Sequence, residues 1–273
     1  MKLKTLIMIA AACAFLTSCI KENRDKCPCY LHVDLSRVDS HYVHRMDLML
    51  ADRFTGDARW IAVEKKYIGD TLIMKVDKSE FDFSAWGNLD KSILDDADRT
   101  ITSADMADSL WSYYKHISTR CEDAFVKVLA ERQHIPVTVI VRGMLQGLTD
   151  IRPAFGNISG SLMYDGTAAG ALGVLVPTLV KSPGDGDSYY MYKTLILTQA
   201  SATDAVLNLH FLKDGRAVET TYPVGEMLAE LGEDISATNQ NPIVIDLTIG
   251  AADILLTIRV SDWSRHGIYT ITY

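Results

Sequence analysis

The chain has 273 residues, of which 48% are hydrophobic and 23% are charged, and its formal net charge is −8. This apolar share is ample for the cores of one large domain or two domains of ordinary size. The acidic balance, and the lack of a basic stripe with interleaved aromatic residues, argue against a nucleic-acid-binding protein.

The first 19 residues have the pattern of an export signal. Two lysines give a positive start, residues 6–15 form an uninterrupted apolar run, and Leu-Thr-Ser leads to Cys19. A charged start, a short apolar segment and small residues before a cut site are typical of a secretory signal. The ending resembles the lipobox of bacterial lipoproteins, which implies that Cys19 becomes the mature N-terminus. It would then carry a diacylglycerol and fatty acyl chains such as palmitate.

The apolar run is too short for a retained transmembrane helix, which needs about 20 residues. A plain secretory signal with a chance cysteine is the remaining alternative. One acyl chain holds a protein to a membrane only reversibly, whereas two or three chains hold it stably. We therefore expect membrane lipid to be a partner through Cys19. Lys21 and Glu22 resemble the signals that send such lipoproteins to the outer face of the outer membrane.

After the signal, a polar tether leads into a segment with strand patterning. Residues 1–18 contain two lysines and no acids, so the mature chain carries a formal charge of −10. Residues 19–28 are mostly polar and charged, which is typical of a linker. Apolar residues then alternate with others in four segments: 31–36, 46–50, 72–76 and 81–85. Alternation with a period of two, broken by Gly, Asp and Asn turns, predicts a β-sandwich rather than βαβ units.

The next segment, 103–133, carries few strand signals. Phe125, Val128, Leu129 and Arg132 follow helical spacing, and Pro136 would stop a helix shortly afterwards. This spacing predicts one or two helices between two β domains.

Strand patterning then returns and continues to the end of the chain. Asp214-Gly215 is a hairpin signal, and residues 226–231 have the pattern of a short helix. Alternating or apolar segments that predict strands are 137–141, 158–164, 194–197, 206–212, 243–249, 256–260 and 268–273. We therefore predict an all-β chain with the following parts: signal peptide 1–18, tether 19–28, N-terminal β-sandwich 29–100, partly helical connection 101–136 and C-terminal β-sandwich 137–273.

Several short motifs occur in a familiar order. They are Cys27-Pro28, the segments 44–48 (His-Arg-Met-Asp-Leu) and 85–88 (Ala-Trp-Gly-Asn), and the stretch from Ile254 to Trp263. Together with the lipobox, this layout resembles the FimB-like family of fimbrial anchor and minor-subunit lipoproteins, found in Gram-negative anaerobes that build type V pili. The resemblance covers nearly the whole chain.

The resemblance implies two tandem transthyretin-like Greek-key β-sandwich domains. It also implies a lipid-anchored cell-surface subunit, with the role of the anchor that attaches the fimbria to the outer membrane. Fimbrial subunits would be its partners through β-strand addition, in which main-chain hydrogen bonds give affinity. The terminal segment 268–273 would either complete its own sheet or be offered to a neighbour. The implied protein has no catalytic residues and no cofactor.

Four cysteines remain after the signal is removed. If Cys19 is lipidated, Cys27, Cys29 and Cys121 are left, and an odd number of thiols in an exported protein leaves one unpaired. The open alternatives are a disulfide from Cys27 or Cys29 to Cys121, free buried thiols, or a metal site. The metal site is disfavoured because the second pair of closely spaced ligands, usual for zinc, is missing.

A second function class fits the same pattern. A surface glycan-binding lipoprotein would share the signal, the tether and the strands, and would expose aromatic side chains such as Trp86, Trp111 and Trp263 as a platform. A secreted hydrolase is disfavoured because no Gly-x-Ser-x-Gly or phosphate-loop motif is present. We therefore expect a protein that is not an enzyme.

Overall fold

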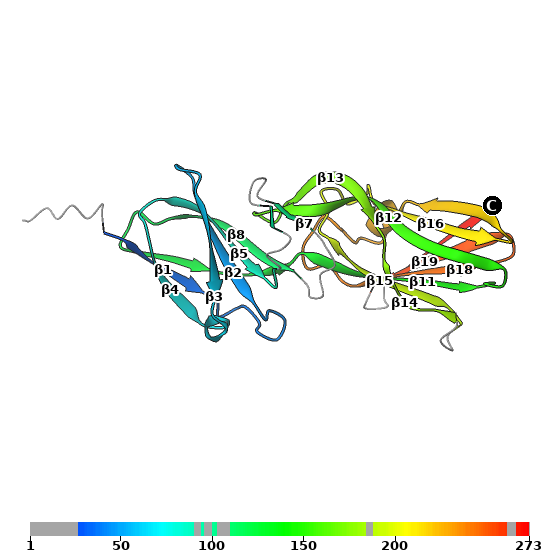
Figure 1. The fold of residues 1–273 in the computed structure, drawn as a ribbon, viewed down its shortest axis with the longest axis horizontal. Helices are drawn as coiled ribbons and strands as arrows, with labels where there is room; N and C mark the ends of the chain where they lie inside the picture. Colours follow the sequence, from blue (N-terminus) through cyan, green and yellow to red (C-terminus); the bar gives the residue numbers. More distant parts are fainter. Residues whose placement is uncertain are drawn as a thin grey trace, which may run out of the picture.

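The computed structural model describes residues 27–89, 94–95, 100–102, 110–183, 188–260 and 266–272. They form two β-sandwich domains arranged end to end (Figure 1). The first strand begins at the tip of the N-terminal domain that is farthest from the C-terminal domain (Figure 1). Within the described ranges, no helix is both long and apolar enough to span a bilayer.

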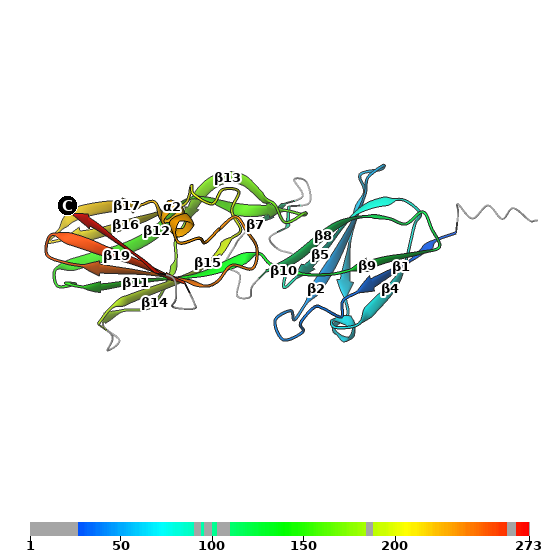
Figure 2. The same ribbon diagram turned by 180° about the vertical axis from the view of Figure 1, so that it is seen from behind.

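The N-terminal domain packs a three-stranded sheet, sheet A, against a five-stranded sheet, sheet B. Sheet A has the order β4 (Thr71–Val76), β1 (Cys29–Asp34) and β9 (Asp123–Lys127), which lie side by side in Figure 2. Sheet B has the order β10 (Glu131–Arg132), β8 (Trp111–Ser118), β5 (Glu80–Gly87), β2 (Met46–Asp52) and β3 (Ala58–Val63). A short 3-10 helix, η2 (Lys65–Tyr67), lies between β3 and β4. Inward-facing apolar residues of both sheets are buried in one core, among them Leu31, Val33, Leu48 and Phe83.

The C-terminal domain packs two six-stranded sheets around its own core. Sheet D has the order β14 (Thr178–Lys181), β15 (Tyr190–Leu197), β11 (His134–Gly143), β18 (Ile243–Ile249), β19 (Asp253–Val260) and β20 (His266–Thr272). Sheet C has the order β17 (Arg216–Tyr222), β16 (Val206–Lys213), β12 (Leu148–Met163), β7 (Thr100–Thr102) and β6 (Leu94–Asp95), and β13 (Ala168–Leu175) pairs with β12. The helix α2 (Val224–Glu230) buries Val224, Met227 and Leu228 against this core.

The prediction of an all-β, sandwich-type chain is confirmed. The expected hairpin is also present, because Asp214 and Gly215 join β16 to β17 with φ values of 51° and 78°. Two consecutive positive φ values are what a two-residue type I′ turn requires, and Asp-Gly suits them. The short helix expected at 226–231 is α2.

The prediction of helical structure within 103–133 is wrong for the residues described there. Residues 111–118 form β8, which pairs with β5, and residues 123–127 form β9, which pairs with β1. Phe125 is 71% exposed, whereas Ala124 and Val126 on either side of it are buried. The true period is therefore two, and the apparent helical spacing combined residues from both faces of a strand.

The chain between β5 and β8 crosses to the other domain. There β7 pairs antiparallel with the end of β12, through Leu162 opposite Ile101, and β6 pairs with β7. The chain then returns to the N-terminal domain as β8. The segment predicted as a connection from 101 to 136 therefore supplies strands to both sandwiches. Backbone hydrogen bonds of the sheets tie the two domains together.

An apolar cluster between the domains, which we call the junction core, adds to this link. Its buried members are Met49, Ala51, Trp86, Leu89 and Leu110 from the N-terminal domain and Leu162, Tyr164 and Leu197 from the C-terminal domain. Trp86 is fully buried, and the Ser84 hydroxyl donates to the Tyr164 carbonyl oxygen at 2.6 Å. The part of the outer face of β2 and β5 that carries Met49 and Trp86 is therefore not solvent-exposed, because the second domain covers it.

Two motifs that are 40 residues apart in the sequence meet beside this junction. Segment 44–48 enters β2, segment 85–88 ends β5, and the two strands pair with Asp47 opposite Trp86. Asn88 has a φ of 60°, accepts the backbone N–H of His44 at 2.9 Å and donates to the carbonyl oxygen of Tyr42 at 2.8 Å. Asn tolerates the left-handed conformation, so it both turns the chain and fixes the entry to β2.

A buried histidine lies where the chain passes from one domain to the other. His134 is fully buried at the start of β11, and its Nδ1 accepts the Leu110 backbone N–H at 2.8 Å. Burial, and after it the nearby Arg132, lowers the pKa of His134 from 6.5 to about 4. The imidazole is therefore neutral at pH 7, with no proton on Nδ1.

We expect this histidine to make stability depend on pH. Its folded-state pKa lies below the value of 6.5 for an exposed imidazole, so protonation favours the unfolded chain. The free energy of unfolding should fall between pH 6.5 and about 4 by roughly 3 kcal/mol from this group. His134→Asn, which keeps an acceptor oxygen near the Nδ1 position, should remove that part of the slope in urea titrations at several pH values. His41→Asn, at an exposed histidine, is the control, and an equal slope in wild type and His134→Asn would contradict the assignment.

Candidate assembly interface

One edge of the C-terminal domain exposes a group of apolar side chains, which we call the apolar ridge. It consists of Val174, Val176, Leu179 and Val180, which are 70%, 64%, 49% and 50% exposed. Isolated exposed apolar residues are ordinary, but a contiguous group of them marks an interaction site more often than chance. The ridge is therefore a candidate contact surface.

The ridge arises where the chain changes sheets. β13 ends beside β12 in sheet C, and two residues later β14 joins sheet D beside β15. The buried Pro177 lies between them and lacks a backbone N–H, so it can occupy this crossing without leaving a donor unpaired. Exposed apolar residues therefore lie on both sides of Pro177, with Val174 and Val176 before it and Leu179 and Val180 after it.

Among the described residues, β14 is the edge strand of sheet D. In the part of the chain with described coordinates, β14 pairs with β15 alone, through Leu179 opposite Tyr192. Edge strands are usually protected from further pairing by charges or proline along their length. Here Thr178, Leu179 and Val180 carry no charge, and Lys181 stands only at the end of the strand. This edge has little protection against the addition of another strand.

The neighbouring edge of β12 is less available. β13 pairs with β12 from Phe155 to Leu162 and covers this edge there. Before Phe155, the described pairing of β12 is with β16, on the opposite side of the strand. The Tyr192 hydroxyl donates to the Ile151 carbonyl oxygen at 2.6 Å, which satisfies this backbone acceptor. Burial, and after it Tyr190 and Asp150, raises the pKa of Tyr192 to about 12, so the hydroxyl stays protonated as a donor. The Tyr192 side chain thus occupies part of the irregular β12 edge.

The sequence left two alternatives for the terminal segment 268–273. In the structure, the described part of this segment completes its own sheet. Residues 266–272 form β20, which pairs antiparallel with β19 through seven residue pairs from Asp253–Thr272 to Arg259–His266. In this structure the strand therefore belongs to its own subunit.

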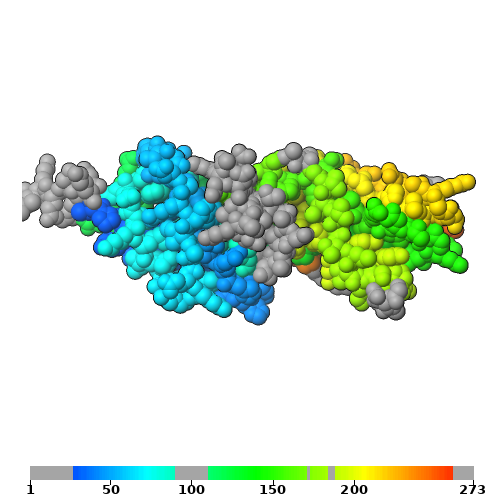
Figure 3. Space-filling view, in the orientation of Figure 1, coloured from blue at the N-terminus to red at the C-terminus, as the bar shows by residue number. Residues whose placement is uncertain are grey.

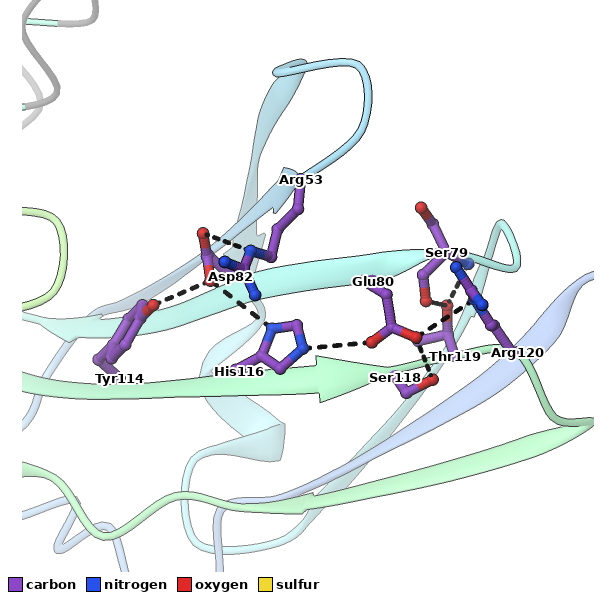
Figure 4. A network of polar contacts seen from close by, with 9 residues as sticks. All are labelled: Arg53, Ser79, Glu80, Asp82, Tyr114, His116, Ser118, Thr119 and Arg120. Atoms are coloured by element: carbon purple, nitrogen blue, oxygen red, sulfur yellow. Dashed lines mark hydrogen bonds and ion pairs between the residues drawn. The ribbon is translucent and has the colours of Figure 1, made fainter.

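Away from the junction core, the outer face of sheet B is polar, unlike the ridge. Glu80 and Asp82 on β5 lie on either side of His116 on β8, whose Nε2 is 3.2 Å from Glu80 Oε2 and whose Nδ1 is 3.7 Å from Asp82 Oδ1 (Figure 4). Further partners complete the network: Tyr114 and Arg53 at Asp82, and Ser118 and Arg120 at Glu80. Such partly exposed ion pairs contribute little to stability, but they keep the face hydrated. It is a poor surface for apolar docking.

The structure brings two of the predicted cysteines together. Cys29 is buried, Cys121 and Cys27 are exposed, and all three thiols are free. Burial, and after it the adjacent Cys121 thiol, raises the pKa of Cys29. The backbone N–H of Tyr30 donates to the Glu122 carbonyl oxygen at 2.7 Å, which holds the two cysteine segments side by side. Cys29 is therefore the neighbour of Cys121, and the disulfide itself stays a prediction.

Other predicted positions are spread over the molecule. Cys19 and Trp263 lie outside the described residues. Trp86 is buried in the junction core and Trp111 is half-buried, so these two do not form an exposed platform. No group of three or more His, Cys, Asp or Glu residues suited to a metal ion occurs among the described residues.

The apolar ridge was not found from the sequence. Its signal is the stretch 168–180, thirteen residues without a charge, which ends in Val-Leu-Val-Pro-Thr-Leu-Val. Such a stretch reads equally well as buried strands, because periodicity alone does not tell which apolar residues are covered. Only the arrangement of the sheets leaves four of its side chains in solvent.

Neither a family model nor a curated protein matches the chain. Solved structures do share its fold. The fimbrial anchor protein Mfa2 from Porphyromonas gingivalis is 14% identical with a TM-score of 0.60, over 87% of this chain and 98% of its own. A candidate polysaccharide-binding protein from Bacteroides thetaiotaomicron gives 14% and 0.60, over 89% and 98%. A candidate adhesin from Bacteroides ovatus gives 11% and 0.58, over 90% and 96%. The chain therefore has the fold of fimbrial and adhesin proteins.

We expect Cys29 and Cys121 to form the disulfide when a thiol oxidant takes up their two electrons and two protons. Closing a loop of roughly 90 residues should stabilise the domain by up to about 4–5 kcal/mol. Peptide mapping of alkylated, non-reduced protein should find the Cys29–Cys121 link and an alkylated Cys27. A Cys27–Cys121 link, or three alkylated thiols after oxidation, would contradict this pairing. Cys27→Ser is the matched control and should leave the link intact.

Proposed function

We propose that this protein is a lipid-anchored subunit of a surface fimbria and that it serves as the anchor. In this proposal Cys19 carries the lipid in the outer membrane, and the C-terminal domain binds the next subunit by adding one of its strands to β14. The observation that carries the proposal is the apolar ridge on an open sheet edge. The shared fold with a fimbrial anchor supports the same role.

The positions of the two ends of the molecule agree with one end being held at the membrane and the other binding a fimbrial subunit. β1 begins at the tip of the N-terminal domain, so a lipid on Cys19 would hold that tip toward the membrane (Figure 1). β14 belongs to the other domain, and the two domains follow one another along the long axis of the molecule (Figure 3). The ridge would therefore stand away from the membrane, where a fimbrial subunit can reach it.

Strand addition explains why the ridge is apolar. The backbone of β14 would supply hydrogen bonds that depend little on sequence, and side chains next to the edge would select the partner. Leu179 and Val180 lie on the edge strand itself, and Val174 and Val176 flank it. A partner strand with apolar residues at alternate positions would cover them. This is a binding role, and it assigns no catalytic residue.

Two variants test the anchor and the docking edge separately. Cys19→Ala should release both the protein and its fimbriae into the medium, because no lipid holds them. Leu179→Lys combined with Val180→Lys should leave the protein in the membrane fraction but release the fimbriae, because charges on an edge oppose strand addition. Binding of the purified partner subunit should weaken about tenfold or more, since each lost central contact costs over about 1 kcal/mol.

Tyr42→Lys is the control, because Tyr42 is 58% exposed in the N-terminal domain and lies away from β14. It should keep both the protein and the fimbriae on the cell. Fimbriae that remain attached in the Leu179→Lys/Val180→Lys variant would reject β14 as the docking edge. Unchanged membrane retention of Cys19→Ala would reject the lipid anchor.

Glycan binding is the second candidate function, and a hollow on the outer face of sheet C favours it. The hollow has a volume of about 280 Å³, and apolar residues including Val176 line it together with polar groups of β16 and β17, among them Asn208, His210, Glu219 and Thr221. These groups sit in cross-strand register, and Thr221 donates to Asn208 Oδ1 at 2.8 Å. A glycan array should show binding that Asn208→Ala abolishes. An array without any bound glycan would dismiss this function.

A further inference from the structure

The outer face of sheet A carries a second exposed group, the sheet A patch, which consists of Tyr30, His32, Ile73 and Phe125. Phe125, Ile73 and Tyr30 are 71%, 55% and 42% exposed. His32 on the central strand stands opposite Ile73 of β4 and Phe125 of β9, so the three side chains form one row across the sheet. Tyr30 lies two residues before His32 and therefore points to the same face.

The side chains of the patch contact one another and have a polar rim. The rings of His32 and Phe125 stack with their centroids 4.5 Å apart, and His32 Nε2 is 2.9 Å from Asp123 Oδ1. Lys75 Nζ lies 5.7 Å from the centre of the Tyr30 ring. Aromatic rings with polar groups beside them are suited to a membrane interface, where one part of a side chain is in lipid and another in water.

The short tether limits how far this patch is from the lipid. Ten residue steps separate Cys19 from Cys29, the first residue of β1, so the two are at most about 35 Å apart. Tyr30 and His32 follow within the next three residues of the strand. A link this short also gives an effective concentration in the millimolar range, so a contact that is weak on its own would be occupied.

We propose that the sheet A patch rests on the phospholipid surface of the membrane that holds Cys19. This inference depends on the lipid anchor of the proposed function and names a second membrane contact for it. The tether favours a lipid surface over a protein partner, because the membrane is always within its reach. The contact would fix how the rod-like molecule stands on the membrane and hence where β14 points.

Hydroxyl-radical footprinting of the full lipidated protein tests this contact. The protein on phosphatidylethanolamine–phosphatidylglycerol vesicles is compared with unlipidated Cys19→Ala in solution, and oxidation is read by mass spectrometry. Oxidation of Tyr30 and Phe125 should fall severalfold on the vesicles. Tyr114 is the internal control because it is also 42% exposed but lies on sheet B, and its oxidation should not change.

Two lipidated variants sharpen the result. Ile73→Ser combined with Phe125→Ser should restore full oxidation of Tyr30 while the lipid keeps the protein on the vesicles. Val174→Ser combined with Val176→Ser, at similarly exposed positions on the ridge, should leave Tyr30 protected. Phe125→Trp should also keep the protection, because it retains an aromatic ring.

The outcomes separate this inference from the anchor. If the lipidated protein stays on the vesicles but Tyr30 and Phe125 react as fast as in solution, the patch does not touch the membrane and the anchor stands. If the lipidated protein does not bind vesicles, the anchor fails and the patch contact with it. Protection that appears in Cys19→Ala as its concentration rises would point to a second copy of the chain and overturn the membrane contact.

Discussion

The rest of the structure depends on the apolar contact between the two sandwiches. The face of β2 and β5 that carries Met49 and Trp86 points away from its own core, and in an isolated domain it would lie in water. Leu162 and Tyr164 of the second domain cover it instead. The chain also places β7 in sheet C of the C-terminal domain, so the domains are joined by both side-chain contacts and backbone hydrogen bonds. These contacts oppose independent movement of the two domains.

Because the two domains are joined in this way, the distribution of polar and apolar surface over them is informative about function. The outer face of sheet B holds a hydrated network around His116, whereas the ridge and the sheet A patch expose apolar side chains. The two apolar surfaces lie on different domains, and the sheet A patch is near the tether while the ridge is not. The sheet A patch is placed to contact a surface beside the tether, and the ridge is placed to contact a partner farther from the tether. Under the proposed function these are the membrane contact and the fimbrial contact, and the link between the domains would pass tension from the fimbria to the membrane.

Sequence patterns predicted well where a single physical cause decides the local structure. Leu31 and Val33 alternate because one side of β1 faces a core, and Asp214-Gly215 turns because both residues accept positive φ. The same reasoning failed at Phe125. This residue lies on the exposed face of a strand, and combining it with residues of the buried face gave an apparent helical period. It also missed β3 (Ala58–Val63), since its partly buried pattern reflects contact with the second domain as well as the first. Of the candidate site, the sequence offered strand addition with a fimbrial subunit but could not say at which sheet edge.

The sequence by itself determined the all-β class and most of the strands, because these depend on local composition and on alternation with a period of two, and it predicted an export signal that ends at Cys19. Tertiary structure decided which strands share a sheet, that Cys29 rather than Cys27 lies beside Cys121, and that β20 stays in its own subunit. It also decided which apolar residues remain in solvent. Trp86 and Val174 look alike as apolar residues in strands, yet one is fully buried and the other is 70% exposed. The difference comes from packing between segments far apart in the chain, which no local pattern records.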